Sequence, residues 1–437
     1  MGISTDKPVL GIDFGTTNCA MALAGNGSAV QVAFFPTILG SSFTFRTVLY
    51  IEQLKQAGTR RRVLSRSGPA AIEGYLAAEE KGRLIQSLKS WLADRLFTGT
   101  EIFGRHYTVG ELVSRILSDL RQHAEQQFGV PIRHAMAGRP VRFVGADTDE
   151  DDAYAVSRLR EAFLAAGFES VEFEMEPVAA AHAYESGLDH DELILIGDFG
   201  GGTSDFSLLR VGPGVCRRGR TERDLLGNSG LGLAGDAFDA RIVRKLVSPA
   251  LGAGSQARSL NKLLPAVPAW IYANLERWHY LSFLRTRNVA EILKSARARA
   301  LEPEKIETLI HLIDEDLGYH LHQAVQRVKF ELSRSEAAEF RFREGSLDLR
   351  IPVHRSDFER WIADDLEKIE TAVDTLLHTT GVPPADVDRV FLTGGTSFVP
   401  AVRAIFASRF GEARIRDGNE FTSVAHGLAL RARQPTV

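Results

Sequence analysis

The fold is decided by Gly11-Ile12-Asp13-Phe14-Gly15-Thr16-Thr17-Asn18, a stretch near the start of this 437-residue chain. The part from Asp13 to Asn18 resembles a second stretch, Asp198-Phe199-Gly200-Gly201-Gly202-Thr203-Ser204-Asp205. Asp198 follows Asp13 by 185 residues. Short apolar, β-rich runs flank both copies, which is the pattern of a strand, a tight turn and a second strand. One such hairpin in each half of the chain predicts two similar lobes.

The composition is that of an ordinary folded protein. The chain is 44% hydrophobic and 25% charged, which excludes a largely disordered or low-complexity protein, and its length fits two or three domains. Cys19 and Cys216 are too few for a disulfide framework. A net charge of -4 offers no broad positive field, so nucleic acid is not expected as a partner. Without a signal peptide or a membrane-spanning run, we expect a cytoplasmic protein that does not contact membranes.

The hydrophobic periodicity predicts alternating strands and helices, hence an α/β protein. The basic stretch at 59–62 predicts a solvated surface loop, and 238–333 predicts a mainly helical segment. The remaining predicted helices are 72–97, 109–128, a helix from the acidic run 147–152 through 166, 177–184, 399–410 and 423–433. The remaining predicted strands are a short one within 135–144 that ends near 138–140, 171–173, 192–198, 206–211 and 389–393.

The glycine turns have the chemistry of a phosphate site. Glycine lets several backbone N–H groups point into one concave turn, and the hydroxyls of Thr16, Thr17 and Thr203 add uncharged donors. Asp13 and Asp198, at strand ends, could hold a Mg²⁺ ion that keeps most of its waters. Two facing turns would then hold a triphosphate and its metal from both sides, while a third turn, Gly394-Gly395, would approach the ribose and adenine.

Two competing nucleotide motifs are excluded. The sequence contains no Gly-x-x-x-x-Gly-Lys-Ser/Thr, the pattern of a P-loop. Residues 230–235 do fit the dinucleotide pattern Gly-x-Gly-x-x-Gly, but a polar segment precedes them in place of a strand. No acidic residue follows between Arg241 and Leu275 to bind a ribose, so a dinucleotide site is not predicted there.

Taken in order along the chain, the motifs resemble the nucleotide-binding domain of the Hsp70 family, within the superfamily of actin, hexokinase and Hsp70 ATPases. The two turns resemble its two phosphate motifs, the second in the Hsp70 form with three consecutive glycines. The other matching segments are Glu176-Pro177-Val178-Ala179-Ala180-Ala181 and Val424-Ala425-His426-Gly427 for the two connecting helices, Gly232-Leu233-Ala234-Gly235-Asp236-Ala237-Phe238-Asp239, and 393–400 for the adenosine motif.

The resemblance implies a role for each matching residue around ATP or ADP and Mg²⁺. Asp13 and Asp198 would bind the metal through water, and Lys89 would act near the γ-phosphate, unless it is only a surface lysine of a helix. Glu176 and Asp205 would position water and metal, and Pro140 would relay the nucleotide state between lobes. The implied phosphate-binding residues are Gly15, Thr16, Thr17, Asn18, Gly200, Gly201, Gly202 and Thr203.

The adenine site carries the main departures from the family. The implied nucleotide-binding residues here are Gln326, Lys329, Phe330, Ser333, Gly394, Gly395, Thr396 and Phe398. Phe330 and Phe398 stand where the family has two arginines that stack on adenine. We expect an aromatic sandwich around the base, with two packed rings as the alternative, and the preference for adenine is left open.

The implied architecture is a two-lobed, actin-like (ribonuclease H-like) α/β ATPase fold with inserted subdomains. We expect lobe I at 1–187 with an insertion at about 36–129, lobe II at 188–414 with a helical insertion at about 241–325, and a last helix at 415–437 that returns to lobe I. The sequence ends soon after this helix, so we expect the family's peptide-binding half to be missing.

The expected function is therefore a chaperone-type ATPase that acts as a nucleotide-driven switch for a protein partner of unknown identity. Two alternatives stay open. One is a phosphotransferase of the same superfamily acting on a small molecule, and the other is a nucleotide-gated interaction protein with negligible hydrolysis. The insertion around Trp270, Trp278 and Tyr280 is predicted to be a packed helical subdomain or, alternatively, a surface for the partner.

Overall fold

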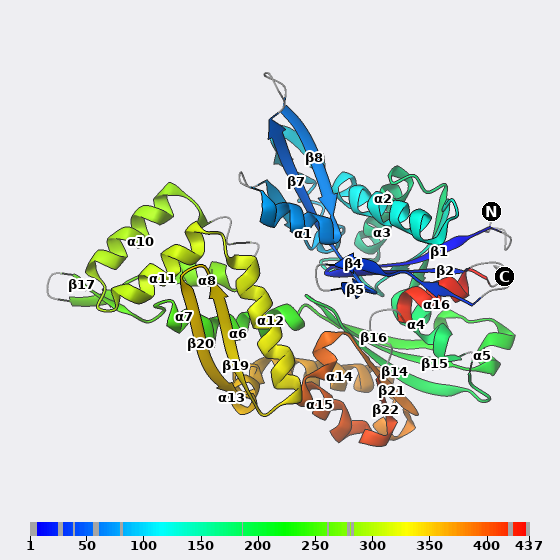
Figure 1. The fold of residues 1–437 in the computed structure, drawn as a ribbon. Helices are drawn as coiled ribbons and strands as arrows, with labels where there is room; N and C mark the ends of the chain where they lie inside the picture. The colour runs from blue at the N-terminus through cyan, green and yellow to red at the C-terminus, as the bar shows by residue number, and fades with distance from the viewer. Residues whose placement is uncertain are drawn as a thin grey trace. The chain divides into compact units, whose positions relative to one another are not determined.

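The computed structural model describes residues 7–24, 29–37, 40–55, 61–78, 82–185, 187–259, 262–277, 280, 284–417 and 423–433 (Figure 1). The chain divides into two compact units. The first unit contains 1–232, 372–395 and 406–437, and the second contains 233–371 and 396–405. The lobe boundaries expected from the sequence stay a prediction.

Two sheets with the same strand pattern form the first unit. One has the order β3-β2-β1-β12-β13 and the other β16-β15-β14-β21-β22. In each sheet the first three strands are antiparallel to one another. The third and fourth strands pair in parallel, and so do the fourth and fifth. The strands of the first sheet are β1 (Val9–Phe14), β2 (Asn18–Ala24), β3 (Gln31–Val32), β12 (His134–Arg139) and β13 (Ser170–Met175), and those of the second are β14 (Glu192–Phe199), β15 (Ser204–Val211), β16 (Leu225–Leu231), β21 (Arg389–Thr393) and β22 (Ile415–Asp417).

The repeated pattern places the two motif copies at equivalent points. The first copy forms the turn between β1 and β2, and the second forms the turn between β14 and β15. Both hairpins predicted from the sequence are therefore confirmed. Asp13 and Asp198 lie near the ends of equivalent strands, because β1 and β14 occupy the same place in their sheets.

Helices α2 (Val109–Phe128) and α3 (Asp149–Ala165) supply the main core of the first sheet. Helix α2 begins at a capping box formed by Thr108 and Glu111 and ends at Gly129 in the left-handed conformation, which explains why its predicted bounds are correct. The acidic first turn of α3 follows the cap residue Thr148, where negative charge stabilises the helix start.

Two helices connect the sheets of the first unit. Helix α16 (Ser423–Arg431) packs on β1 and β2, and α4 (Glu176–Glu185) lies beside it (Figure 1). Ala179 of α4 joins an apolar cluster with the first sheet, whereas Ala181 joins a cluster with the second. The two helices cross so closely that a Cβ atom on Gly427 would lie 1.7 Å from the carbonyl oxygen of Ala179. Helix α4 therefore contacts both sheets.

Part of one predicted helix is wrong. Residues 72–97 were expected to be helical, but α1 (Gly68–Ala77) ends early and β9 (Arg83–Gln86) pairs with β7 (Val48–Lys55). Leu88–Trp91 then forms a short 3₁₀ turn. The predicted loop at 59–62 is also corrected: 59–60 lie outside the described residues, while 61–62 begin β8 (Arg61–Ser67), which pairs with β7.

Smaller elements complete the first unit. They are β4 (Phe35–Thr37), β5 (Gly40–Ser42), β6 (Phe45–Arg46), which pairs with β2, β10 (Gly99–Ile102), β11 (Arg105–Thr108), α5 (Pro213–Arg218) and 3₁₀ turns at Glu222–Asp224, Pro384–Asp386 and Glu412–Arg414. Among the helices that the structure describes, none is long and apolar enough to cross a lipid bilayer.

The second unit is mainly helical between 238 and 333, as predicted, although a two-stranded hairpin interrupts the helices. Its elements are α6 (Gly235–Ile242), a π-helical turn (Val243–Val247), α7 (Ser248–Ala250), β17 (Gln256–Ser259), β18 (Lys262–Pro265), α8 (Ala269–Leu275), α10 (Arg287–Arg299), α11 (Pro303–Asp314), α12 (Gly318–Arg334), β19 (Ala337–Glu344), β20 (Leu347–His354) and α13 (Arg355–Trp361). Helices α14 (Ala363–Thr380) and α15 (Pro400–Phe410) extend across the boundaries between the units.

Candidate functional site

The conformation of each glycine turn is fixed by hydrogen bonds to its backbone carbonyls. In the first turn, the Thr47 hydroxyl donates to the Gly15 carbonyl at 2.8 Å, and the Thr47 N–H donates to the Thr17 carbonyl at 2.8 Å. In the second turn, the Gly200 N–H donates to the Thr203 carbonyl at 2.8 Å. The Thr47 bonds fix the first turn from a neighbouring segment, whereas the Gly200–Thr203 bond closes the second turn on itself. Both turns are therefore preformed, as an anion site requires.

The two turns meet. A Cβ atom placed on Gly201 would lie only 1.9 Å from the Thr17 hydroxyl oxygen, so the backbone of the second turn approaches the side chain of the first. Thr16 and Thr203 are half-buried in their turns, and the Asn18 side chain accepts a long hydrogen bond of 3.5 Å from Arg46. The structure thus brings together the turns that the sequence places 185 residues apart.

A buried ion pair lies at the centre of the site. The Lys89 ammonium donates to the Glu176 carboxylate at 2.6 Å, and the two side chains are only 8% and 15% exposed. Lys89 comes from the 3₁₀ turn after β9, and Glu176 is the first residue of α4. Burial acts to lower the pKa of Lys89, but the Glu176 and Asp13 carboxylates outweigh it and raise the pKa, so the ammonium stays charged.

Three further carboxyl groups gather around this pair. Burial, with the nearby charge of Glu176, raises the pKa of Asp13 to about 8. Burial and the charge of Asp198 raise the pKa of Asp205 to about 7. The pKa of Asp198 is also raised, mainly by burial. Because these carboxylates act on one another, Asp13, Asp198 and Asp205 share one electrostatic site with Lys89 and Glu176.

The site combines four carboxyl groups with one ammonium group, so it favours binding of a cation once the carboxyl groups ionise. Its oxygen ligands are those that Mg²⁺ prefers. Within the described ranges, however, no three His, Cys, Asp or Glu side chains are grouped so that they could hold a metal ion together. The residues therefore fit Mg²⁺ that keeps its own waters and takes further oxygen ligands from a bound phosphate group.

Two residues that contact the site were missed by sequence reasoning. The Thr393 hydroxyl donates to the Asp198 carboxylate at 2.6 Å, and Thr47 shapes the first turn. The sequence signal for Thr393 was its place at the end of the predicted strand 389–393, directly before the Gly394–Gly395 turn. Its position beside Asp198 follows only from the parallel pairing of β21 with β14. No local pattern marks Thr47, which reaches the turn only through the pairing of β2 with β6.

The third glycine turn belongs to the first unit. Gly394 has a φ of +84°, and a Cβ atom there would lie 1.9 Å from the carbonyl oxygen of Phe199. Only glycine fits this backbone, since the left-handed conformation and the close approach both exclude a side chain. Gly395 follows it and is exposed.

The other residues expected at the adenine lie in the second unit. Phe330, on α12, is 49% exposed, and Phe398, in the 3₁₀ turn Gly395–Phe398, is 46% exposed. The Arg334 guanidinium lies over the Phe330 ring at 4.2 Å, so one face of that ring already carries a cation. Whether the two rings enclose a base stays a prediction.

The neighbours of Phe330 on α12 have different environments. The Lys329 ammonium pairs with the Asp239 carboxylate at 2.7 Å, and the Ser333 hydroxyl donates to the Phe330 carbonyl at 2.7 Å. Gln326 is exposed. Thr396, which lies in the 3₁₀ turn Gly395–Phe398 and not on α12, is buried. Of the residues expected to bind nucleotide on this helix, Gln326 and Phe330 are therefore the most accessible.

Two comparisons show which known proteins the chain is similar to. A family model described as "Hsp70 protein" matches residues 80–255 and 304–434. The chain is 28% identical over 427 residues to the Chaperone protein DnaK of Thermosipho africanus, covering 97% of this chain and 58% of that protein. It is 27% identical over 432 residues to that of Thermosipho melanesiensis (98% and 59% covered) and 28% over 431 residues to that of Thermotoga maritima (97% and 59%).

The chain spans just under three fifths of the length of these curated relatives. The family match covers the second sheet, strands β12 and β13 of the first sheet and both connecting helices. It gives the fold class expected from the sequence, the mixed α/β, two-lobed, actin-like ATPase fold. On this evidence the chain belongs to the Hsp70 family.

Proposed function

We propose that this protein binds ATP or ADP with Mg²⁺, hydrolyses ATP slowly, and acts as a chaperone-type conformational switch. The observation that carries the proposal is the buried Lys89–Glu176 ion pair. Three carboxyl groups with raised pKa values lie around this pair, and the two glycine turns beside it contact each other. This arrangement combines donors for a phosphate chain with acceptors for a hydrated cation.

The turns bind the phosphate chain in this proposal. Backbone N–H groups of 15–18 and 201–203 donate to the phosphate oxygens, and the hydroxyls of Thr16, Thr17 and Thr203 add further donors. The Lys89 ammonium, oriented by Glu176, stabilises negative charge on the γ-phosphate as the bond to the β-phosphate breaks. The charge of Lys89 is in place before the reaction, so no reorganisation is needed.

Asp13 and Asp198 hold the waters of the cation. When bound, Mg²⁺ neutralises charge on the phosphate oxygens. Asp205 and Glu176 orient the attacking water and receive its proton, and the raised pKa of Asp205, about 7, suits a group that exchanges protons near neutral pH. Thr393 holds Asp198 in place by donating to it.

Phe330 and Phe398 stack on the adenine in this proposal, supported by their exposure and by the aromatic preference of nucleobases. Gln326, Lys329, Ser333, Thr396 and the Gly394–Gly395 turn complete the nucleoside site. The relatives are named chaperone proteins, which supports a protein partner that responds to the nucleotide state. Lobe I (1–187), lobe II (188–414) and the returning helix (415–437) are the parts that would move.

The test measures nucleotide binding and ATP turnover of the whole chain, with and without Mg²⁺. We expect Mg²⁺-dependent binding, slow hydrolysis, and loss of hydrolysis in Lys89→Ala and Asp198→Asn. Lys245→Ala, which changes an exposed lysine of the second unit, serves as the matched control and should leave turnover unchanged. Absence of nucleotide binding in the unaltered protein would overturn the proposal.

Two further results would favour the alternatives. Turnover that rises only when a small acceptor such as a sugar is added would indicate a phosphotransferase. Nucleotide binding without measurable hydrolysis would indicate an interaction protein gated by nucleotide. A pull-down in ATP and in ADP separates this last role from the ATPase switch by revealing proteins retained in only one state.

A further inference from the structure

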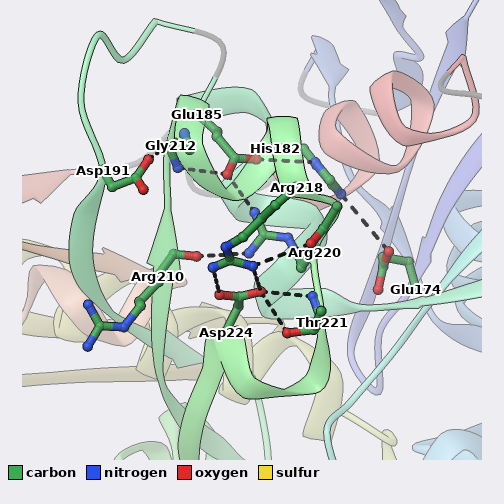
Figure 2. Close-up of polar contacts among 12 residues, drawn as sticks. Glu174, His182, Glu185, Asp191, Arg210, Gly212, Arg218, Arg220, Thr221 and Asp224 are labelled. Carbon is green, nitrogen blue, oxygen red and sulfur yellow. Dashed lines mark hydrogen bonds and ion pairs between the residues drawn. The ribbon is translucent and has the colours of Figure 1, made fainter. Parts of the chain in front are cut away.

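Helix α4 is attached to the second sheet by a buried carboxylate at its C-terminal end. The Glu185 side chain is 3% exposed, and it accepts from the Gly212 N–H at 2.8 Å and from the Arg220 guanidinium at 2.7 Å (Figure 2). Arg220 also donates to the Arg210 carbonyl at 3.0 Å. Arg210 lies on β15, and Gly212 is the residue directly after this strand. The end of α4 is therefore tied directly to the second sheet.

Contacts from the same end of α4 toward the first sheet are longer. Glu174, on β13, lies 4.0 Å from His182 of α4 and 3.4 Å from Arg431 of α16 (Figure 2). His182 lies between two carboxylates, since Glu185 is 3.7 Å from its other ring nitrogen. A buried carboxylate with two short donors is costly to separate from them, whereas pairs near 4 Å gain little. We therefore expect this end of α4 to follow the second sheet.

The opposite end of α4 carries Glu176, one member of the Lys89–Glu176 ion pair. Glu176 begins the helix directly after β13 ends at Met175, and its carboxylate accepts from Lys89. The helix is ten residues long, which is roughly 15 Å, and a helix of this length behaves as a rigid rod. One end of the rod thus binds Lys89 while the other is fixed to the second sheet.

We propose that Glu185 and Arg220 are positioning residues for the Lys89–Glu176 pair. By fixing the C-terminal end of α4 to the second sheet, they pass any movement of this sheet along the helix to the Glu176 carboxylate. The inference rests on the proposed function, in which the Lys89–Glu176 pair takes part in ATP hydrolysis. It adds that Glu185 and Arg220 couple movement of the second sheet to this pair. It also predicts that the bending point lies at Met175–Glu176, where strand and helix join without a loop.

The experiment compares Arg220→Met and Glu185→Gln with a matched control, Arg218→Met. Arg218 lies on the same segment and makes a two-point ion pair with Asp224, and that pair involves no residue of α4 (Figure 2). We measure ATP affinity, the single-turnover hydrolysis rate and the thermal midpoint of each variant. The double variant, with both Arg220→Met and Glu185→Gln, is measured as well. If the two residues share one role, the double variant should hydrolyse ATP no more slowly than the slower of the two single variants.

We expect the hydrolysis rate to fall about tenfold in Arg220→Met and Glu185→Gln, with ATP affinity within about twofold of the unaltered protein. Arg220→Lys should recover part of the rate, and Arg218→Met should leave it unchanged. Unchanged hydrolysis in both Arg220→Met and Glu185→Gln would overturn the inference. An equal loss in Arg218→Met would also do so, because it would show that only the stability of the segment matters.

Hydrogen exchange of the nucleotide-free protein provides a readout that does not depend on activity. In Arg220→Met we expect faster exchange at Leu88–Trp91, far along the chain from the substitution, and no such change in Arg218→Met. Changes confined to 210–224 would contradict the inference. If the unaltered protein binds no nucleotide, the proposed function fails, and this exchange experiment still decides whether α4 couples the two ends.

Discussion

Gly201 and Thr17 lie so close that a methyl group on Gly201 would be 1.9 Å from the Thr17 hydroxyl oxygen and 2.8 Å from its Cβ atom. Thr17 is branched at Cβ and short, so it cannot move aside as a long side chain would. We expect Gly201→Ala to destabilise the nucleotide-free protein by about 1–3 kcal/mol, the usual cost of overpacking. The thermal midpoint, measured without nucleotide, checks this.

The neighbouring glycine provides the control for this experiment. A Cβ atom on Gly202 would meet no atom within 4 Å, so Gly202→Ala should leave the thermal midpoint of the nucleotide-free protein unchanged. Equal thermal midpoints for the two variants would show that the turns are not in contact. The comparison uses the ligand-free protein because a bound phosphate could fill the space beside Gly202.

The sequence was sufficient to predict these turns because their signal is local. A glycine-rich stretch between two apolar runs predicts a hairpin without knowledge of distant residues, and both hairpins are confirmed. The region before Lys89 shows the opposite case. Apolar spacing in 72–97 resembles a helix, yet 83–86 gain more by pairing with β7, a choice that only the folded chain offers.

The pH dependence of stability should reveal the crowded carboxylates. Asp205 has an ordinary pKa of 3.8 in the unfolded chain and about 7 in the folded protein, so the folded state binds the extra proton between these values. The free energy of unfolding therefore falls as the pH rises through this window, by up to about 1.4 kcal/mol per pH unit for one group. Asp205→Asn should remove this contribution and raise the thermal midpoint more at pH 8 than at pH 4.

A carboxylate with the opposite shift is the control. Arg409 holds the pKa of Asp374 below its ordinary value, so ionised Asp374 stabilises the folded state. Asp374→Asn should therefore lower the thermal midpoint, and the loss should be larger at pH 8 than at pH 3. If Asp205→Asn and Asp374→Asn shift the midpoint in the same direction at pH 8, the assignment of raised pKa to Asp205 is wrong.

Substitution of Phe330 and Phe398 tests how the protein binds the adenine base. Stacking on an aromatic ring contributes about 1–3 kcal/mol, so Phe330→Ala and Phe398→Ala should each weaken ATP binding about 5- to 150-fold. Binding of tripolyphosphate, which has no base, should not change. Phe34→Ala is the control, because Phe34 is 47% exposed but lies on the first unit, outside the proposed adenine site. Unaltered ATP affinity in both variants would mean that the two rings only cover the protein surface.

The role of individual residues was harder to predict than the turns. Lys89 could have been a surface lysine of a helix, and only its burial and its bond to Glu176 separate the two interpretations. Both facts depend on residues 87 positions apart in the chain. The same holds for Thr393, whose contact with Asp198 joins residues 195 positions apart through the parallel pairing of β14 and β21.

Thr393→Val tests whether this last contact matters for the cation. Valine keeps the shape of threonine but cannot donate to the Asp198 carboxylate, and that donation lowers the pKa of Asp198 against the effect of burial. Without it the pKa of Asp198 should rise further, so that the carboxylate ionises less readily and binds the waters of Mg²⁺ less well. We expect the Mg²⁺ concentration for half-maximal ATP binding to increase about tenfold or more, since a single hydrogen bond to a charged group contributes about 1.5–3 kcal/mol and about 1.4 kcal/mol corresponds to tenfold. Thr393→Ser retains the hydroxyl and should therefore keep the Mg²⁺ dependence of the unaltered protein. If it does not, the site requires the methyl group of Thr393 and not its hydrogen bond.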